Sequence, residues 1–67
     1  MERSGTVTEF SFEAGLGSLT ADDGEVLAVH GTAIADGSRD IAVGARVRFA
    51  VRPGHHGRWE AADIVAA

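Results

Sequence analysis

Glycine punctuation limits what this chain can fold into more than any other feature of its sequence. Nine glycines and a single proline divide the 67 residues into short segments rich in Val, Phe, Thr and Ile. Such segments are typical of β-strands, and the frequent turns leave little room for helices. A chain of this length buries one small core, so we expect a single all-β domain over residues 1–67.

Five segments have the residue content or the alternation of strands. The clearest is 46–52, where Val47, Phe49 and Val51 fall on one face and the arginines fall on the other. The other segments that we predict as strands are 6–12, 18–20, 26–30 and 58–65.

The connections between these segments predict the topology. Gly15 and Gly17 are expected to form a bend, Asp22-Asp23-Gly24 a turn, and Thr32-Ala33-Ile34-Ala35 a short helical turn within a long link. Five short strands with a long link after the third match the small antiparallel Greek-key barrel called the OB-fold. Closing the sheet would remove its exposed edges. The predicted core consists of Val7, Leu19, Val29, Ile34, Val47, Phe49 and Ile64.

Composition narrows the classes of function and location. Six arginines, no lysine and ten acidic residues give a net charge of −4, which argues against a strong electrostatic grip on phosphate. The absence of cysteine excludes disulfides and thiolate metal sites. No apolar run is long enough to span a membrane, and Met1-Glu2-Arg3-Ser4 lacks the layout of a signal peptide. We therefore expect a cytoplasmic protein that is not associated with a membrane.

Catalysis and metal binding have no support in the sequence. No nucleophile lies beside a base, and Gly15-x-Gly17 is too short for a phosphate-cradling loop. His55 and His56 are adjacent, so on a strand they would point to opposite faces, and no cysteine or suitably spaced carboxylate completes a ligand set. We expect neither an enzyme nor a bound cofactor or metal.

Several short motifs occur in a fixed order along residues 5–65. They are Gly5-Thr6-Val7, Phe10, Gly15, Gly17, Asp22-Asp23-Gly24, Val29-His30, Thr32-Ala33-Ile34, the run from Val43 to Val51, and Ala61-Ala62-Asp63-Ile64. This ordered set resembles the cold-shock domain family. The resemblance implies a five-stranded OB barrel whose aromatic side chains stack on single-stranded RNA or DNA. It also implies a role in RNA chaperoning or transcript regulation.

The resemblance is incomplete at the positions where that family binds bases. The family's tryptophan falls on Glu9, its phenylalanines fall on Leu16, Ser18, Ala28 and Gly31, and its histidine is retained as His30. Stacking stabilises binding by about 1–3 kcal/mol per base, so losing two or three contacts would move a micromolar affinity into the millimolar range. The resemblance also places the charge of Glu9 where a phosphodiester strand would pass.

The candidate nucleic-acid-binding residues are Phe10, Phe12, Leu16, His30 and Arg58. His30 is either a base contact or a retained surface histidine. Phe10 and Phe12 either contribute to the binding face or pack against the barrel, Leu16 or Trp59. Trp59 itself is either a partner anchor or a cover for the core. Arg58 belongs with Arg46, Arg48 and Arg52 to a concentration of positive charge that either steers an acidic ligand or keeps the sheet soluble.

Two functions follow from this pattern. The first is a cold-shock-like protein that binds single-stranded nucleic acid weakly, through a degenerate binding face. The alternative is a protein-interaction module on an OB scaffold, whose partner contacts the aliphatic surface of Leu16, Ala28 and Gly31. The substitution Leu16→Asp tests this alternative. The family pattern places this side chain outside the barrel core, so the substitution should leave the fold intact and abolish contact with a partner.

Overall fold

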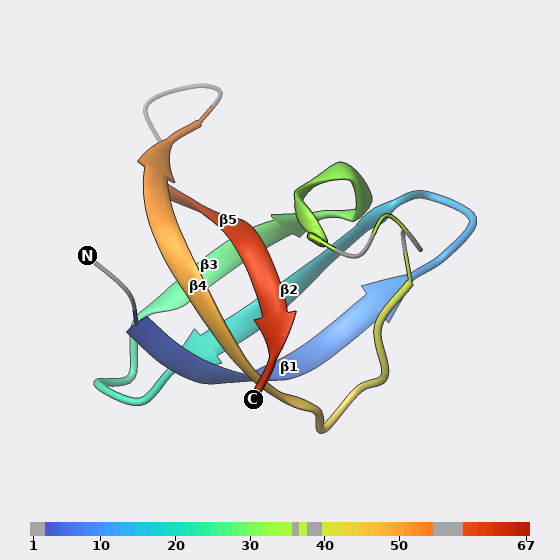
Figure 1. Ribbon diagram of the computed structural model, residues 1–67. Coiled ribbons are helices and arrows are strands. Elements are labelled where there is room, and N and C mark those ends of the chain that lie inside the picture. The colour runs from blue at the N-terminus through green and yellow to red at the C-terminus, as the bar shows by residue number, and fades with distance from the viewer. Residues whose placement is uncertain (1–2, 36, 38–39, 55–58) are drawn as a thin grey trace.

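The computed structural model describes residues 3–35, 37, 40–54 and 59–67. The elements within these ranges are β1 (Arg3–Ser11), β2 (Leu16–Ala21), β3 (Val26–His30), the 3-10 helix η1 (Gly31–Ala33), β4 (Arg46–Pro53) and β5 (Trp59–Ala66). The five strands form a closed barrel in the order β1-β2-β3-β5-β4. Figure 1 shows β4 and β5 crossing over the meander of β1, β2 and β3. The predicted fold class, an OB-type barrel, is confirmed.

Four of the five strand pairings are antiparallel: β1 with β2, β2 with β3, β1 with β4, and β4 with β5. The barrel closes between β3 and β5, which run parallel and share the register pair Ala28 and Glu60. We call this junction the β3–β5 seam. It brings the end of the chain beside its third strand, a contact that no local pattern in the sequence predicts.

Strand boundaries differ from the predictions where pairing is long-range. β1 begins at Arg3, ahead of the predicted residue 6, because Arg3 pairs with Phe49 of β4. Phe12 was predicted to extend this strand but lies in the turn that follows it. Gly15 lies in that turn with φ +67°, whereas Gly17, expected in the bend, lies within β2 opposite Phe10. A short helical turn is present as η1, but it spans Gly31–Ala33 rather than the predicted 32–35, and Ile34 already has an extended backbone.

The core fills the barrel as predicted. All seven expected core residues are at most 6% exposed, from Leu19, Val29 and Val47 at 0% to Ile34 at 6%. Leu27, at 1% exposure, is a core residue that the sequence analysis missed. The core is completed by the smaller side chains of Ala21, Ala61 and Ala62.

Two irregularities shape the side of the barrel formed by β1 and β2. A bulge between Val7 and Glu9 shifts the register, and both Thr8 and Glu9 are exposed there. Opposite the end of β1, a Cβ atom on Gly17 would lie 2.7 Å from Phe10 Cα and 2.8 Å from Phe10 Cδ1. Only glycine fits this close approach, which lets Phe10 pack against the core.

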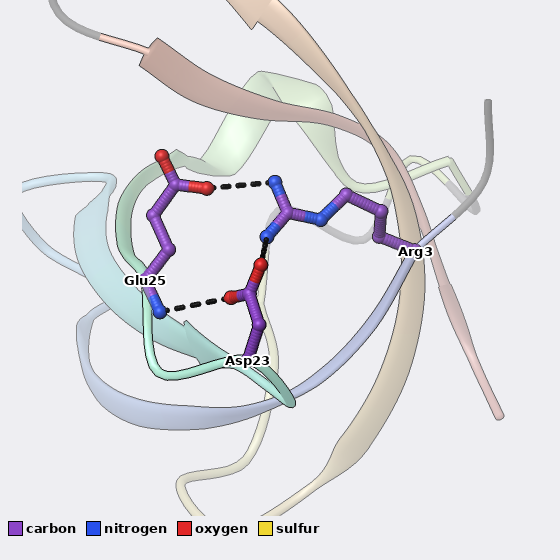
Figure 2. A network of polar contacts seen from close by, with 3 residues as sticks. All are labelled: Arg3, Asp23 and Glu25. Atoms are coloured by element: carbon purple, nitrogen blue, oxygen red, sulfur yellow. Dashed lines mark hydrogen bonds and ion pairs between the residues drawn. The ribbon is translucent and has the colours of Figure 1, made fainter.

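Ion pairs attach the β2–β3 turn to the neighbouring strands. Arg3 donates to Asp23 Oδ2 and Glu25 Oε1, each at 2.7 Å, as Figure 2 shows. Arg46 donates to both oxygens of Asp22, at 2.7 and 3.0 Å. The hydrogen bond from Arg46 lowers the pKa of Asp22 below its ordinary value of 3.8, and the opposite charge adds to this effect.

The pairing of the arginines bears on how their charge is used. Arg46 and Arg52, two of the four arginines expected to concentrate positive charge, form ion pairs with Asp22 and Asp63. These pairs are exposed and therefore contribute little to stability. They do neutralise much of the charge that was considered for steering an acidic ligand. Arg58 lies outside the described residues, as do His55 and His56.

Candidate nucleic-acid interface

The register of β1, β2 and β3 brings six side chains together in two rows. One row is Glu9, Ser18 and Ala28, and the next is Ser11, Leu16 and His30. Residues that pair across neighbouring strands lie on the same side of a sheet. The buried row of Val7, Leu19 and Leu27 occupies the other side, inside the barrel. We call the two exposed rows the outer face.

Exposed apolar side chains lie at one end of the outer face. Leu16 is 46% exposed, and Phe12, in the turn after β1, is 64% exposed. Phe12 and His30 line one shallow hollow, together with Gly15, Gly31 and Thr32. Leu16 lines a hollow beside it with Glu9, Phe10 and Ser18. Three of the five predicted site residues, Phe12, Leu16 and His30, are therefore neighbours.

The hydrogen bond between His30 Nε2 and Glu60 Oε2 is 2.6 Å long, and it holds the histidine against the β3–β5 seam. The side chain of His30 is 38% exposed and that of Glu60 is 19% exposed. The contact fixes the ring while leaving part of it accessible at the edge of the outer face. It also brings a carboxylate close to a surface that was expected to contact phosphates.

A second carboxylate lies on the outer face itself. Glu9 is exposed, and its Oε1 accepts a hydrogen bond of 3.4 Å from Ser18 Oγ. Within the part of the chain that the structure describes, this long bond from a neutral hydroxyl is the polar contact of Glu9, and no opposite charge pairs with it there. The middle of the outer face is therefore unfavourable for a phosphodiester backbone.

The other predicted residues are placed differently. Phe10 is partly buried and packs against the core rather than standing on the outer face. Gly31 is buried and donates its backbone N–H to Gly15 O at 2.8 Å. The aliphatic surface expected from Leu16, Ala28 and Gly31 is thus formed by Leu16 and Ala28 without Gly31.

The sequence analysis considered Trp59 as a packing partner of Phe10 or Phe12, as a partner anchor or as a cover for the core. The residue is 54% exposed, which is inconsistent with its reading as a cover for the core. It lines a hollow with Ser18, Val26 and Ala28, so it lies beside the outer face at the end remote from Phe12. The connection depends on the β3–β5 seam, and no signal in the local sequence reveals it.

The described residues hold no group of three or more His, Cys, Asp or Glu side chains suited to a metal ion. Within the same part of the chain, no helix has the length and apolar character needed to cross a membrane.

Comparison with known proteins gives two informative relatives. No protein-family model matches the chain. Glycine-rich protein 2 of Nicotiana sylvestris is 45% identical over 62 residues, which cover 90% of this chain and 29% of that protein. Cold shock protein 1 of Arabidopsis thaliana is 38% identical over 65 residues, which cover 94% of this chain and 22% of that protein. The chain thus spans less than a third of the length of the curated relatives it matches.

Proposed function

We propose that this chain binds single-stranded RNA or DNA weakly through the outer face. Its similarity to the two relatives and its closed five-stranded barrel relate the chain to the cold-shock domain family. One observation carries the proposal: the barrel brings Phe12, Leu16 and His30 together at one end of a continuous exposed surface. Base edges and ring faces would contact these side chains, and the phosphates would lie toward solvent. The proposed role is binding, with no catalytic step.

The composition of the outer face supports low affinity. Among its six residues only His30 carries a ring on which a base could stack, and Phe12 adds a second ring at its border. Stacking contributes about 1–3 kcal/mol per base, so two such contacts give about 2–6 kcal/mol, less than the roughly 8 kcal/mol of micromolar binding. The carboxylates of Glu9 and Glu60 oppose phosphate at the same surface. We expect dissociation constants between tens of micromolar and millimolar.

Titration with an oligothymidylate, followed by NMR chemical shifts at low salt, tests this proposal. The largest shifts are expected at Phe12, Leu16 and His30, and the affinity should fall as salt is added. Phe12→Ala should weaken binding about fivefold or more. Val43→Ala removes a side chain of similar exposure, 61% against 64%, from the link before β4 and should change nothing. Sub-micromolar affinity would contradict the proposed weakness, and no shift at millimolar oligonucleotide would exclude nucleic acid as the ligand.

A protein partner is the second candidate function. It is favoured by the exposure of Leu16 and Phe12, because exposed apolar surface is typical of contact sites. Leu16→Asp should leave the fold intact and abolish self-association or capture of the partner. If Leu16→Asp instead unfolds the domain, residue 16 belongs to the core and the outer face is misassigned.

A cytoplasmic location and a single domain over residues 1–67 belong to the same proposal. They are supported by the small closed barrel and by the composition of the chain. Fractionation of cells that express the protein tests the location. Limited proteolysis tests the extent of the domain, since protection should run through all five strands.

A further inference from the structure

The hollow beside Trp59 brings two large exposed apolar side chains together. It is lined by Trp59, Val26, Ala28, Ser18, Leu27 and Glu25, which come from β2, β3, β5 and the turn before β3. Val26 is 66% exposed and Trp59 is 54% exposed, while Ala28 offers only a methyl group between them. The largest aromatic side chain of the protein is therefore accessible in a shallow, largely apolar hollow.

This hollow is continuous with the proposed interface. Ser18 lines both the hollow beside Trp59 and the hollow beside Leu16. Ser18 and Ala28 are also register partners in the middle row of the outer face. A ligand that lies on the outer face can therefore pass from Leu16 to Trp59 without leaving the protein surface.

The carboxylate that lines the hollow beside Trp59 is paired with an arginine. The carboxylate in the hollow, Glu25, accepts a hydrogen bond from Arg3 at 2.7 Å, and the same guanidinium holds Asp23 (Figure 2). Among the described residues, Glu9, on the other side of Ser18, has only a long bond from a hydroxyl. A phosphodiester strand therefore meets a carboxylate beside Trp59 that shares one guanidinium with Asp23, and a carboxylate beside β1 whose partner among the described residues is a hydroxyl.

We propose that Trp59 is a base-stacking residue and that, with Val26 and Ala28, it forms a second subsite for single-stranded nucleic acid. The inference rests on the proposed function and extends it. Ala28 and His30 are two residues apart on β3, which separates the two ends of the site by about 7 Å along this strand, in addition to the strand spacing. One base stacks at Trp59, another contacts Phe12 and His30, and the intervening nucleotides cross Ser18 and Ala28. Aromatic side chains then contact the nucleic acid at both ends of the site.

The experiment compares three forms of the protein with two ligands at low salt. The ligands are a thymidine dinucleotide and an oligothymidylate of about eight nucleotides, a length within the range of OB-fold site sizes. Trp59→Leu keeps an apolar side chain and removes the ring, whereas Trp59→Phe keeps a ring. Affinity is measured by calorimetry, and the fluorescence of Trp59 is followed in the parent. Because Trp59 is exposed, both variants should keep a Tm within about 4 °C of the parent.

The expected result is a loss of affinity for the octanucleotide of about 5- to 150-fold in Trp59→Leu, with recovery in Trp59→Phe. The dinucleotide should not distinguish the variants as strongly, since it can occupy one end alone. Quenching of Trp59 fluorescence in the parent should accompany binding.

Each contrary result has a separate meaning. If the parent binds the octanucleotide and Trp59→Leu binds it equally well, the subsite is wrong and the proposed function stands. A loss in Trp59→Leu that Trp59→Phe does not restore overturns stacking. If Trp59→Leu alters sedimentation and leaves oligonucleotide binding unchanged, the surface contacts protein and the proposal fails. If the parent does not bind the octanucleotide at all, the proposed function fails together with the subsite.

Discussion

The inner and outer surfaces of β1–β3 are made by the same three strands, yet they differ in almost every physical property. The inner row of Val7, Leu19 and Leu27 is apolar throughout, and each residue is at most 1% exposed. The neighbouring outer row combines a carboxylate, a hydroxyl and a methyl group, on Glu9, Ser18 and Ala28. The inner row belongs to the core that fills the barrel, and the outer row does not. The fold therefore persists although the outer face lacks the rings that a strong stacking platform needs.

Two leucines of β2 provide the largest expected difference between the surfaces. Leu19 is 0% exposed and Leu16 is 46% exposed. Leu19→Ala should destabilise the domain by about 2–5 kcal/mol, because it removes buried apolar contacts and leaves a cavity. Leu16→Ala should change the free energy of unfolding by less than about 0.5 kcal/mol. Urea denaturation of both variants measures the difference, and similar losses would show that the two surfaces are not energetically separate.

Gly17, also on β2, tests how closely the backbones of β1 and β2 approach each other. Gly17→Ala would force a Cβ atom to within 2.7 Å of Phe10 Cα, so β1 and β2 must separate or Phe10 must shift. We expect a loss of about 1–3 kcal/mol. Gly24→Ala is the control, since φ is +94° there but nothing lies within 4 Å of the added atom. A smaller loss in Gly17→Ala than in Gly24→Ala would contradict the close approach.

Removing the charge of Glu9 should alter binding without altering stability. Glu9→Gln keeps the shape of an exposed side chain and should raise the affinity for single-stranded nucleic acid by about fivefold at low salt. The gain should shrink as salt is added. Asp40→Asn changes the net charge equally, but Asp40 lies beside Ile34 and Ile64 rather than on the outer face. Equal gains in both variants would attribute the effect to net charge alone.

The smallest expected effect concerns acid stability. The pKa of Asp22 is lowered in the folded state by the hydrogen bond from Arg46, so its contribution is fully present above the ordinary value of 3.8. That contribution is lost as the pH falls through the lowered pKa. Asp22→Asn lacks this titration, so its Tm should fall less steeply than that of the parent below about pH 4. Identical slopes would mean that the pair with Arg46 has no effect on stability.

The core of the barrel could be predicted from the sequence because it follows local alternation and the positions of the glycines. Val47 and Phe49 show this on β4, and both are buried. Leu27 was missed because it lies within the continuous apolar run Val26-Leu27-Ala28-Val29, in which alternation cannot be seen. Its burial becomes evident only from its pairing with Leu19.

The outer face could be predicted only in part. Leu16 and His30 were identified from the strand pattern and the family resemblance, and the register places them opposite each other. Glu60 and Trp59 reach the same region through the β3–β5 seam, which joins residues far apart in the chain. Features that depend on closure of a barrel have no short-range signature, and for this reason the acidic neighbour of His30 was not foreseen.

The seam has a further consequence for how the barrel opens. β3 and β5 share one register pair, whereas β1 with β2 and β4 with β5 share six each. The seam also joins residue 28 to residue 60, so its loop closure is entropically more demanding than the pairing of β1 with β2. Amide hydrogens beside it should therefore exchange with solvent sooner than those of β1 and β2, through local openings that leave the meander intact. A nucleic-acid strand lying from Ser18 to Trp59 would contact both β3 and β5. It would therefore slow amide exchange at the seam by stabilising the closed barrel.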